Sequence, residues 1–170
     1  MTTLARVGLV LLTALIVQMG VVTEVRPLGV MADLMLLVAM SAAVAGGPDR
    51  GAVVAFFAGI AYDLLLTTPF GLTALAYCLV AYGVGSLQAG TSAVRSTRWL
   101  PAVTVGLASA AGVALYALLG AVVGQESMVS ARLPTIMGVV GLVNLVLAVP
   151  AVGVLRWAMA DPVRTKVFAR

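Results

Sequence analysis

Two acidic side chains lie inside otherwise apolar runs, and they are the residues of this sequence best suited to chemistry. Asp33 stands in "PLGVMADLMLL" and Asp63 in "GAVVAFFAGIAYDLLL". A charged side chain at the middle of a membrane costs at least about 2.5–3.5 kcal/mol, so an acid in such a run needs a partner or a cavity. Three roles are open for the pair: a catalytic dyad, a binding site, or the capping of helices.

The catalytic role has little support in the surrounding residues. An aspartic protease shares one proton between two close carboxylates. Asp63 is preceded by "GIAY" rather than by the Gly-x-Gly stretch of prepilin-peptidase-like and presenilin-like enzymes, and no motif surrounds Asp33. The chain has no histidine and one cysteine, Cys78, which removes His-dependent triads and the common zinc sites. We therefore expect no enzyme, no catalytic residue, no cofactor and no metal.

Small residues lead up to the second aspartate at a spacing of four. Gly51, Ala55, Gly59 and Asp63 share one face of a helix. This small-xxx-small pattern lets helix backbones approach closely. The face either receives a helix from a partner protein or packs inside the chain itself, and Asp63 either joins that seam or meets interfacial water and Arg26.

The elements that position these residues follow from composition. The 170-residue chain is 62% hydrophobic and 9% charged, whereas a soluble domain is about a quarter charged. Six apolar segments are separated by turn-forming stretches such as "AGGPDRG" and "TTPFG". We predict an all-α integral membrane protein, one domain over 1–170 that forms a compact bundle of six transmembrane helices. The predicted spans are 7–22, 28–45, 51–66, 71–87, 100–123 and 133–157.

Basic residues predict the orientation of these spans. With six spans, eight of the ten basic residues fall on the side of the two termini, which places both termini in the cytoplasm. The eight are Arg6, Arg50, Arg95, Arg98, Arg156, Arg164, Lys166 and Arg170. They form no cluster of five, so we expect the lipid bilayer and no nucleic acid as a partner.

Other polar and aromatic residues carry weaker signals. Asn144, deep in the last span, predicts a hydrogen bond between helices rather than a ligand contact. Aromatic residues near span ends are typical anchors at the membrane–water interface, and we assign that role to Tyr62, Tyr77, Tyr82, Trp99 and Trp157.

The stretch 48–82, "PDRGAVVAFFAGIAYDLLLTTPFGLTALAYCLVAY", resembles the central signature of the MreD family of rod-shape-determining membrane proteins. In that signature a glycine after a loop precedes a Gly-Phe-x-x-Gly-x-x-x-Asp run, a Pro/Leu-Gly hairpin and a span of the form "ALAxxxxAY". Ala55 and Phe70 depart from it, at a glycine and a leucine position respectively. The positions that match are Gly51, Phe56, Gly59, Asp63, Pro69, Gly71, Ala74, Leu75 and Tyr82, and Asp33 fits the family's second span.

The resemblance implies a function that the residues alone do not give. It implies a non-enzymatic scaffold of the bacterial cell-elongation machinery, in the cytoplasmic membrane. It implies partnership with an MreC-like bitopic protein and, indirectly, with the wall polymerase and transpeptidase complex and the MreB cytoskeleton. The family is also similar in fold to the six-helix substrate-binding subunits of energy-coupling-factor transporters. A vitamin- or metal-binding transporter subunit is therefore the alternative.

Overall fold

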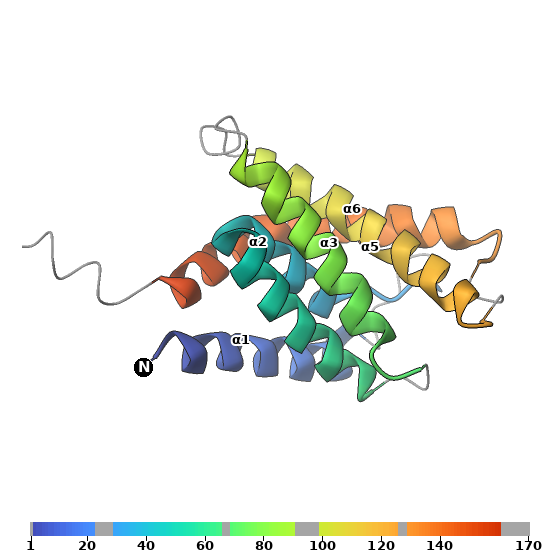
Figure 1. Ribbon diagram of the computed structural model, residues 1–170, viewed down its shortest axis with the longest axis horizontal. Coiled ribbons are helices and arrows are strands. Elements are labelled where there is room, and N and C mark those ends of the chain that lie inside the picture. Colours follow the sequence, from blue (N-terminus) through green and yellow to red (C-terminus); the bar gives the residue numbers. More distant parts are fainter. Residues whose placement is uncertain (1, 23–28, 66–68, 91–98, 126–128, 161–170) are drawn as a thin grey trace, which may run out of the picture.

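The computed structural model describes residues 2–22, 29–65, 69–90, 99–125 and 129–160. In these ranges the chain forms five α-helices and one π-helical turn, and it contains no β-strand (Figure 1). The elements are α1 (Thr3–Val17), the π-helical turn η1 (Gln18–Val22), α2 (Leu34–Asp63), α3 (Leu72–Ala89), α5 (Leu100–Val122) and α6 (Leu133–Met159).

The prediction of six separate helices is not supported, because the second and third predicted spans belong to one element. The expected linker "AGGPDRG" is helical in α2 except at Gly47, whose φ of 80° and ψ of −174° interrupt the helix. This region of backbone space is open essentially to glycine alone. Pro48 follows directly and cannot donate a helical hydrogen bond. α2 therefore consists of two halves, 34–46 and 48–63, joined at a single residue.

The two halves of α2 lie against each other beyond this break. A Cβ placed on Gly51 would lie 2.9 Å from the backbone nitrogen of Ala43. In a straight helix, residues eight apart are about 12 Å apart along the axis. α3 closes the same corner, since a Cβ on Gly85 would lie 2.6 Å from the nitrogen of Pro48. Glycine is needed at both positions because backbone, rather than a flexible side chain, occupies the space.

The remaining helices pack around α2. α2 makes most of its contacts with α3, and α5 makes most of its contacts with α6. α1 runs along one side of the bundle, against α2 and α6 (Figure 1). The start of α1 and the end of α6 meet, because the Arg6 guanidinium lies 5.1 Å from the ring centre of Trp157. The described chain thus begins and ends at the same end of the bundle.

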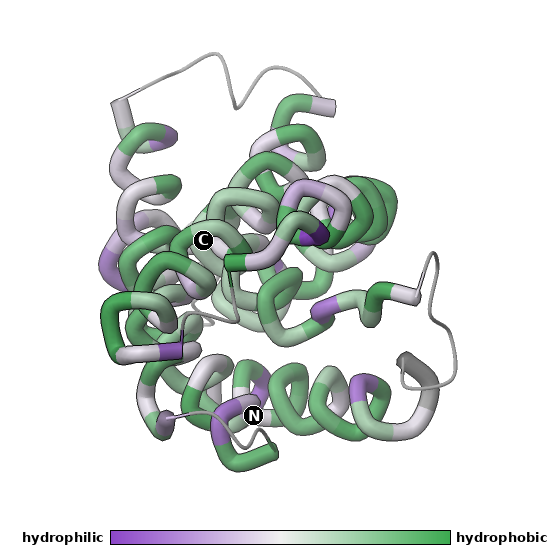
Figure 2. Tube along the Cα trace, turned by 90° about the vertical axis from the view of Figure 1, so that its right-hand side faces the viewer, coloured by the Kyte–Doolittle hydropathy of each residue, from purple (hydrophilic) through white to green (hydrophobic). Residues whose placement is uncertain are grey.

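Four helices are long and apolar enough to cross a membrane: the segments Thr3–Gly20, Leu72–Ala89, Leu100–Val122 and Leu133–Met159. Figure 2 shows that most residues of these helices are apolar and that the polar residues are scattered among them. Buried side chains of α2, α3, α5 and α6, among them Met35, Leu36, Met40 and Val105, form the core. α1 differs from the others because none of its residues is buried.

Candidate functional site

Asp63 binds the start of the next helix. It ends α2, is 3% exposed, and receives three hydrogen bonds from backbone N–H groups. Its Oδ2 accepts from Gly71 at 2.9 Å and from Ala74 at 3.3 Å, and its Oδ1 accepts from Thr73 at 3.3 Å. The first N–H groups of a helix have no partner within the helix, and a negative group there is favoured by the helix dipole. The N-cap residue of α3 is Gly71, which has no side chain to accept these hydrogen bonds. Asp63 thus caps α3 from the end of α2.

Asp33 caps its own helix and also reaches α3. It is the N-cap of α2, and its Oδ1 accepts from the backbone N–H of Leu36 at 2.8 Å. Its Oδ2 accepts a hydrogen bond from the Tyr77 hydroxyl. The helix therefore begins after Asp33, although the predicted second span, 28–45, includes this residue. Of the roles left open by the sequence, capping describes both aspartates.

Two amide side chains tie further helices to this end of α2. Asn144 of α6 donates from Nδ2 to the Ser109 hydroxyl of α5 at 2.9 Å and to the Asp33 carbonyl at 3.3 Å. The predicted hydrogen bond between helices at Asn144 is confirmed. Gln18 of the π-helical turn donates to the Ala32 carbonyl at 3.0 Å and accepts from the Leu34 N–H at 2.8 Å. These contacts satisfy backbone groups that lipid cannot.

The stripe of small residues contacts the chain itself. A Cβ on Gly59 would lie 2.6 Å from the backbone nitrogen of Ala74, so the second half of α2 touches the first turn of α3. Ala55 is completely buried, whereas Phe56 next to it is 45% exposed. The stripe brings α2 close enough for Asp63 to reach the N–H groups of α3. Whether any of these residues also contacts a partner stays a prediction.

The hairpin residues of the signature shape the start of α3. Gly71 is the N-cap of α3 and has a φ of 92°, a left-handed conformation that favours glycine. Its N–H is the one held most closely by Asp63. The Pro69 carbonyl accepts from the N–H of Leu72 at 3.2 Å, which closes the turn. Arg26, expected near Asp63, lies outside the described residues.

A cavity of about 200 Å³ lies beside Asp33. Tyr62, Tyr77 and Tyr116 line it with Asp33, and most of the other lining residues are apolar. No hydrogen bond joins Asp33 to Asp63 in the described part of the chain, and Asp63 does not line the cavity. Each carboxylate is instead engaged by hydrogen-bond donors of its own. Within the same residues, no three metal-ligating side chains come together.

Two polar contacts were not foreseen from the sequence. Tyr77 was predicted to anchor the chain at the membrane–water interface, but it is 2% exposed and its hydroxyl donates a hydrogen bond to Asp33. Tyr82, Trp99 and Trp157 are exposed as an interfacial role requires. Gln18 was also missed, although a lone amide in an apolar run is the same signal that identified Asn144.

An apolar groove lies between α1 and the second half of α2. It has a volume of about 420 Å³. Val53 and Phe57 of α2 and Leu4 of α1 line it and are exposed. The complete lining is Thr3, Leu4, Val7, Leu11, Asp49, Arg50, Val53, Val54, Phe57 and Met159. The groove lies where α1, which has no buried residue, does not cover the exposed side chains of α2.

These features define a helical membrane protein whose buried polar groups hold its own helices together. Comparison with protein families then identifies the group. Residues 2–157 match the family described as rod shape-determining protein MreD, so the chain belongs to the MreD family. No curated protein and no solved structure matches the chain. The predicted similarity in fold to the six-helix transporter subunits therefore has no support.

Proposed function

We propose that this protein is a non-enzymatic scaffold of the bacterial cell-elongation machinery that docks the transmembrane helix of a bitopic, MreC-like partner. Membership of the MreD family gives the role in rod-shape determination. The docking of a helix is our extension of that role. Through such a partner, the protein would help to organise the wall polymerase and transpeptidase complex and the MreB cytoskeleton.

The groove between α1 and α2 is the observation that carries the proposal. Its walls are apolar, as a site inside a bilayer must be, and the exposed Val53 and Phe57 project from a helix whose opposite face is fully packed. Asp49 and Arg50 line the same groove and give it one polar end. An apolar helix with a polar flank, which is the form of a bitopic membrane anchor, fits both features.

We also propose that the chain crosses the cytoplasmic membrane six times, with both termini in the cytoplasm. The fold-back at Gly47 supports six crossings because the two halves of α2 lie against each other and can cross the membrane as two separate spans. The excess of basic residues that the sequence predicts on the side of the two termini supports the orientation. Fusions of a periplasm-active and a cytoplasm-active reporter to the C-terminus test it, and activity of the periplasmic reporter would contradict it.

Filling the groove tests the docking proposal. Val53→Trp places a large ring at an exposed position, so the chain should fold while the partner helix is excluded. Overpacking costs about 1–3 kcal/mol, so we expect about a tenfold loss of MreC co-purified from detergent-solubilised membranes. Retention should be measured at equal amounts of folded protein.

The matched control is Val146→Trp on α6, which changes the same residue type at a position 66% exposed and outside the groove. Co-purification should be unchanged in this variant. Equal retention of the partner by the two variants would show that the groove is not its site. A cysteine at position 53, in a chain whose Cys78 is replaced by serine, should crosslink to the partner's membrane anchor.

A further inference from the structure

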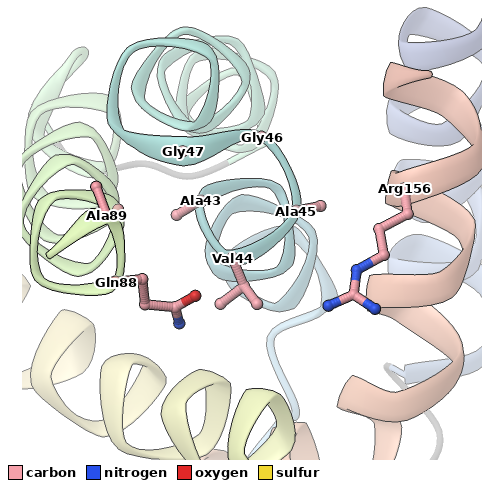
Figure 3. Close-up of a pocket in the computed structure, with 9 residues that line it drawn as sticks. Ala43, Val44, Ala45, Gly46, Gly47, Gln88, Ala89 and Arg156 are labelled. Carbon is pink, nitrogen blue, oxygen red and sulfur yellow. The ribbon is translucent and has the colours of Figure 1, made fainter. Parts of the chain in front are cut away.

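A second cavity lies at the end of the bundle where the chain begins and ends. Its volume is about 470 Å³, and the residues at the break in α2 form part of its wall (Figure 3). It is lined by Ala43, Val44, Ala45, Gly46, Gly47, Gly85, Gln88, Ala89 and Arg156. It shares no lining residue with the groove between α1 and α2. A ligand in it would therefore be independent of the proposed docking site.

Two hydrogen-bond donors flank this cavity. Figure 3 shows Gln88 of α3 and Arg156 of α6 extending from opposite sides toward Val44. The Arg156 guanidinium has only donors, the Gln88 amide has two donor hydrogens and one acceptor oxygen, and none of the lining residues has a carboxylate. The cavity therefore has a positive charge and no negative side chain in its wall.

Neither donor is used by the rest of the described chain. Nε2 of Gln88 is buried and has no hydrogen-bond partner among the described residues. Arg156 is exposed, lines the cavity and makes no hydrogen bond or ion pair in the same part of the chain. If the two side chains served only to satisfy the last carbonyls of 34–46, a bond from Gln88 to one of them would be present. A buried donor without an acceptor, such as Nε2 of Gln88, is costly, which points to an external acceptor.

The position of the cavity relative to the bilayer surface indicates where that acceptor comes from. Arg156 precedes Trp157, which is 54% exposed, and Trp99, the residue before α5, is 71% exposed. Exposed tryptophans mark the headgroup level of a bilayer. Basic pockets between transmembrane helices at this level bind phospholipid headgroups.

We propose that this cavity binds a phosphate group, held by Arg156 and Gln88. The guanidinium supplies the charge and two parallel N–H groups, and the amide supplies one further N–H group. The phosphate belongs either to an anionic phospholipid of the surrounding leaflet or to a soluble phosphate ester. Of the three glycines in the lining, Gly47 has open space where a Cβ would lie, so its backbone is accessible to such a group.

Lipid binding to the purified full-length chain tests the proposal. Native mass spectrometry in a detergent without phosphate measures the binding of phosphatidylglycerol and of diacylglycerol with the same acyl chains. We expect phosphatidylglycerol to bind at least about tenfold more tightly, because a charge-assisted hydrogen bond contributes that much. Arg156→Gln should remove this preference, and Gln88→Leu, which leaves the charge unchanged, should weaken binding about threefold to tenfold.

The control is Arg6→Gln, which removes the same charge at the same end of the bundle but outside the cavity. It should keep the preference. If Arg6→Gln and Arg156→Gln weaken binding equally, or if Gln88→Leu has no effect, binding follows overall charge and the proposal is wrong. Titration of glycerol 3-phosphate separates the two sources: displacement of the lipid indicates a soluble ester, and retention indicates the lipid. Circular dichroism of each variant should show an unchanged fold.

Discussion

Replacing Asp63 with alanine should loosen the contact between α2 and α3. The change removes the acceptor of three backbone N–H groups and leaves those of Thr73 and Ala74 buried. At about 1 kcal/mol for each lost hydrogen bond, the free energy of unfolding should fall by about 3 kcal/mol. Asp63→Asn keeps one acceptor oxygen, which can serve part of the set, so a loss of about 1–2 kcal/mol is expected.

Equilibrium unfolding in mixed micelles of detergent and dodecyl sulfate, followed by circular dichroism, measures these losses. Asp49→Ala is the control, because Asp49 is an exposed acid of the same α2 that makes no hydrogen bond within the described residues. It should change the free energy of unfolding by no more than about 0.5 kcal/mol. Hydrogen–deuterium exchange adds a local measurement, since the amides of Thr73 and Ala74 should exchange faster in Asp63→Ala.

Two results would refute the reasoning about Asp63. If Asp63→Ala unfolds like Asp49→Ala, the three hydrogen bonds do not hold the start of α3. If Asp63→Asn loses more stability than Asp63→Ala, the number of acceptors is not what matters, and the charge itself would be the important property.

Three further changes test the packing and the second aspartate. Gly59→Ala forces a Cβ against Ala74 and should cost about 1–3 kcal/mol, whereas Gly83→Ala, in open space on α3, should be neutral or stabilising in the same unfolding experiment. Tyr77→Phe removes the donor to Asp33 and should cost about 1.5–3 kcal/mol, whereas Tyr82→Phe, at an exposed position, should cost less than about 0.5 kcal/mol. Gly47→Ala places a Cβ at a φ of 80° and should cost about 1–3 kcal/mol; wild-type stability of that variant would contradict the glycine-only turn.

The class of the fold was predictable from the sequence because it follows from composition. A chain with few charges and long apolar runs has to form helices in a bilayer, where every backbone group needs an internal partner. The position of Asn144 between helices followed from the same rule. The number of helices did not follow, because "AGGPDRG" has the composition of a loop while only Gly47 leaves the helical conformation.

The partners of the aspartates were beyond the sequence because they depend on packing between distant segments. The spacing of four from Gly51 to Asp63 predicted a close seam, but both a partner helix and the chain's own α3 satisfied that pattern. The structure places α3 there, through the contact of Gly59 with Ala74. Tyr77 was assigned to the interface by its residue type, yet its position in the buried face of α3 brings its hydroxyl to Asp33.

The use of small residues inside the chain has a consequence for how a partner would bind. Helices associate in lipid through close packing and hydrogen bonds, since lipid is as apolar as the side chains. The glycines that permit close approach are occupied by Ala43, Ala74 and Pro48 of the chain itself. The groove beside α1 instead presents large side chains such as Val53 and Phe57, which keep a docked helix farther away than α2 is from α3. A helix held there would bind less tightly than the protein's own helices bind one another, and such a partner can dissociate without disturbing the bundle.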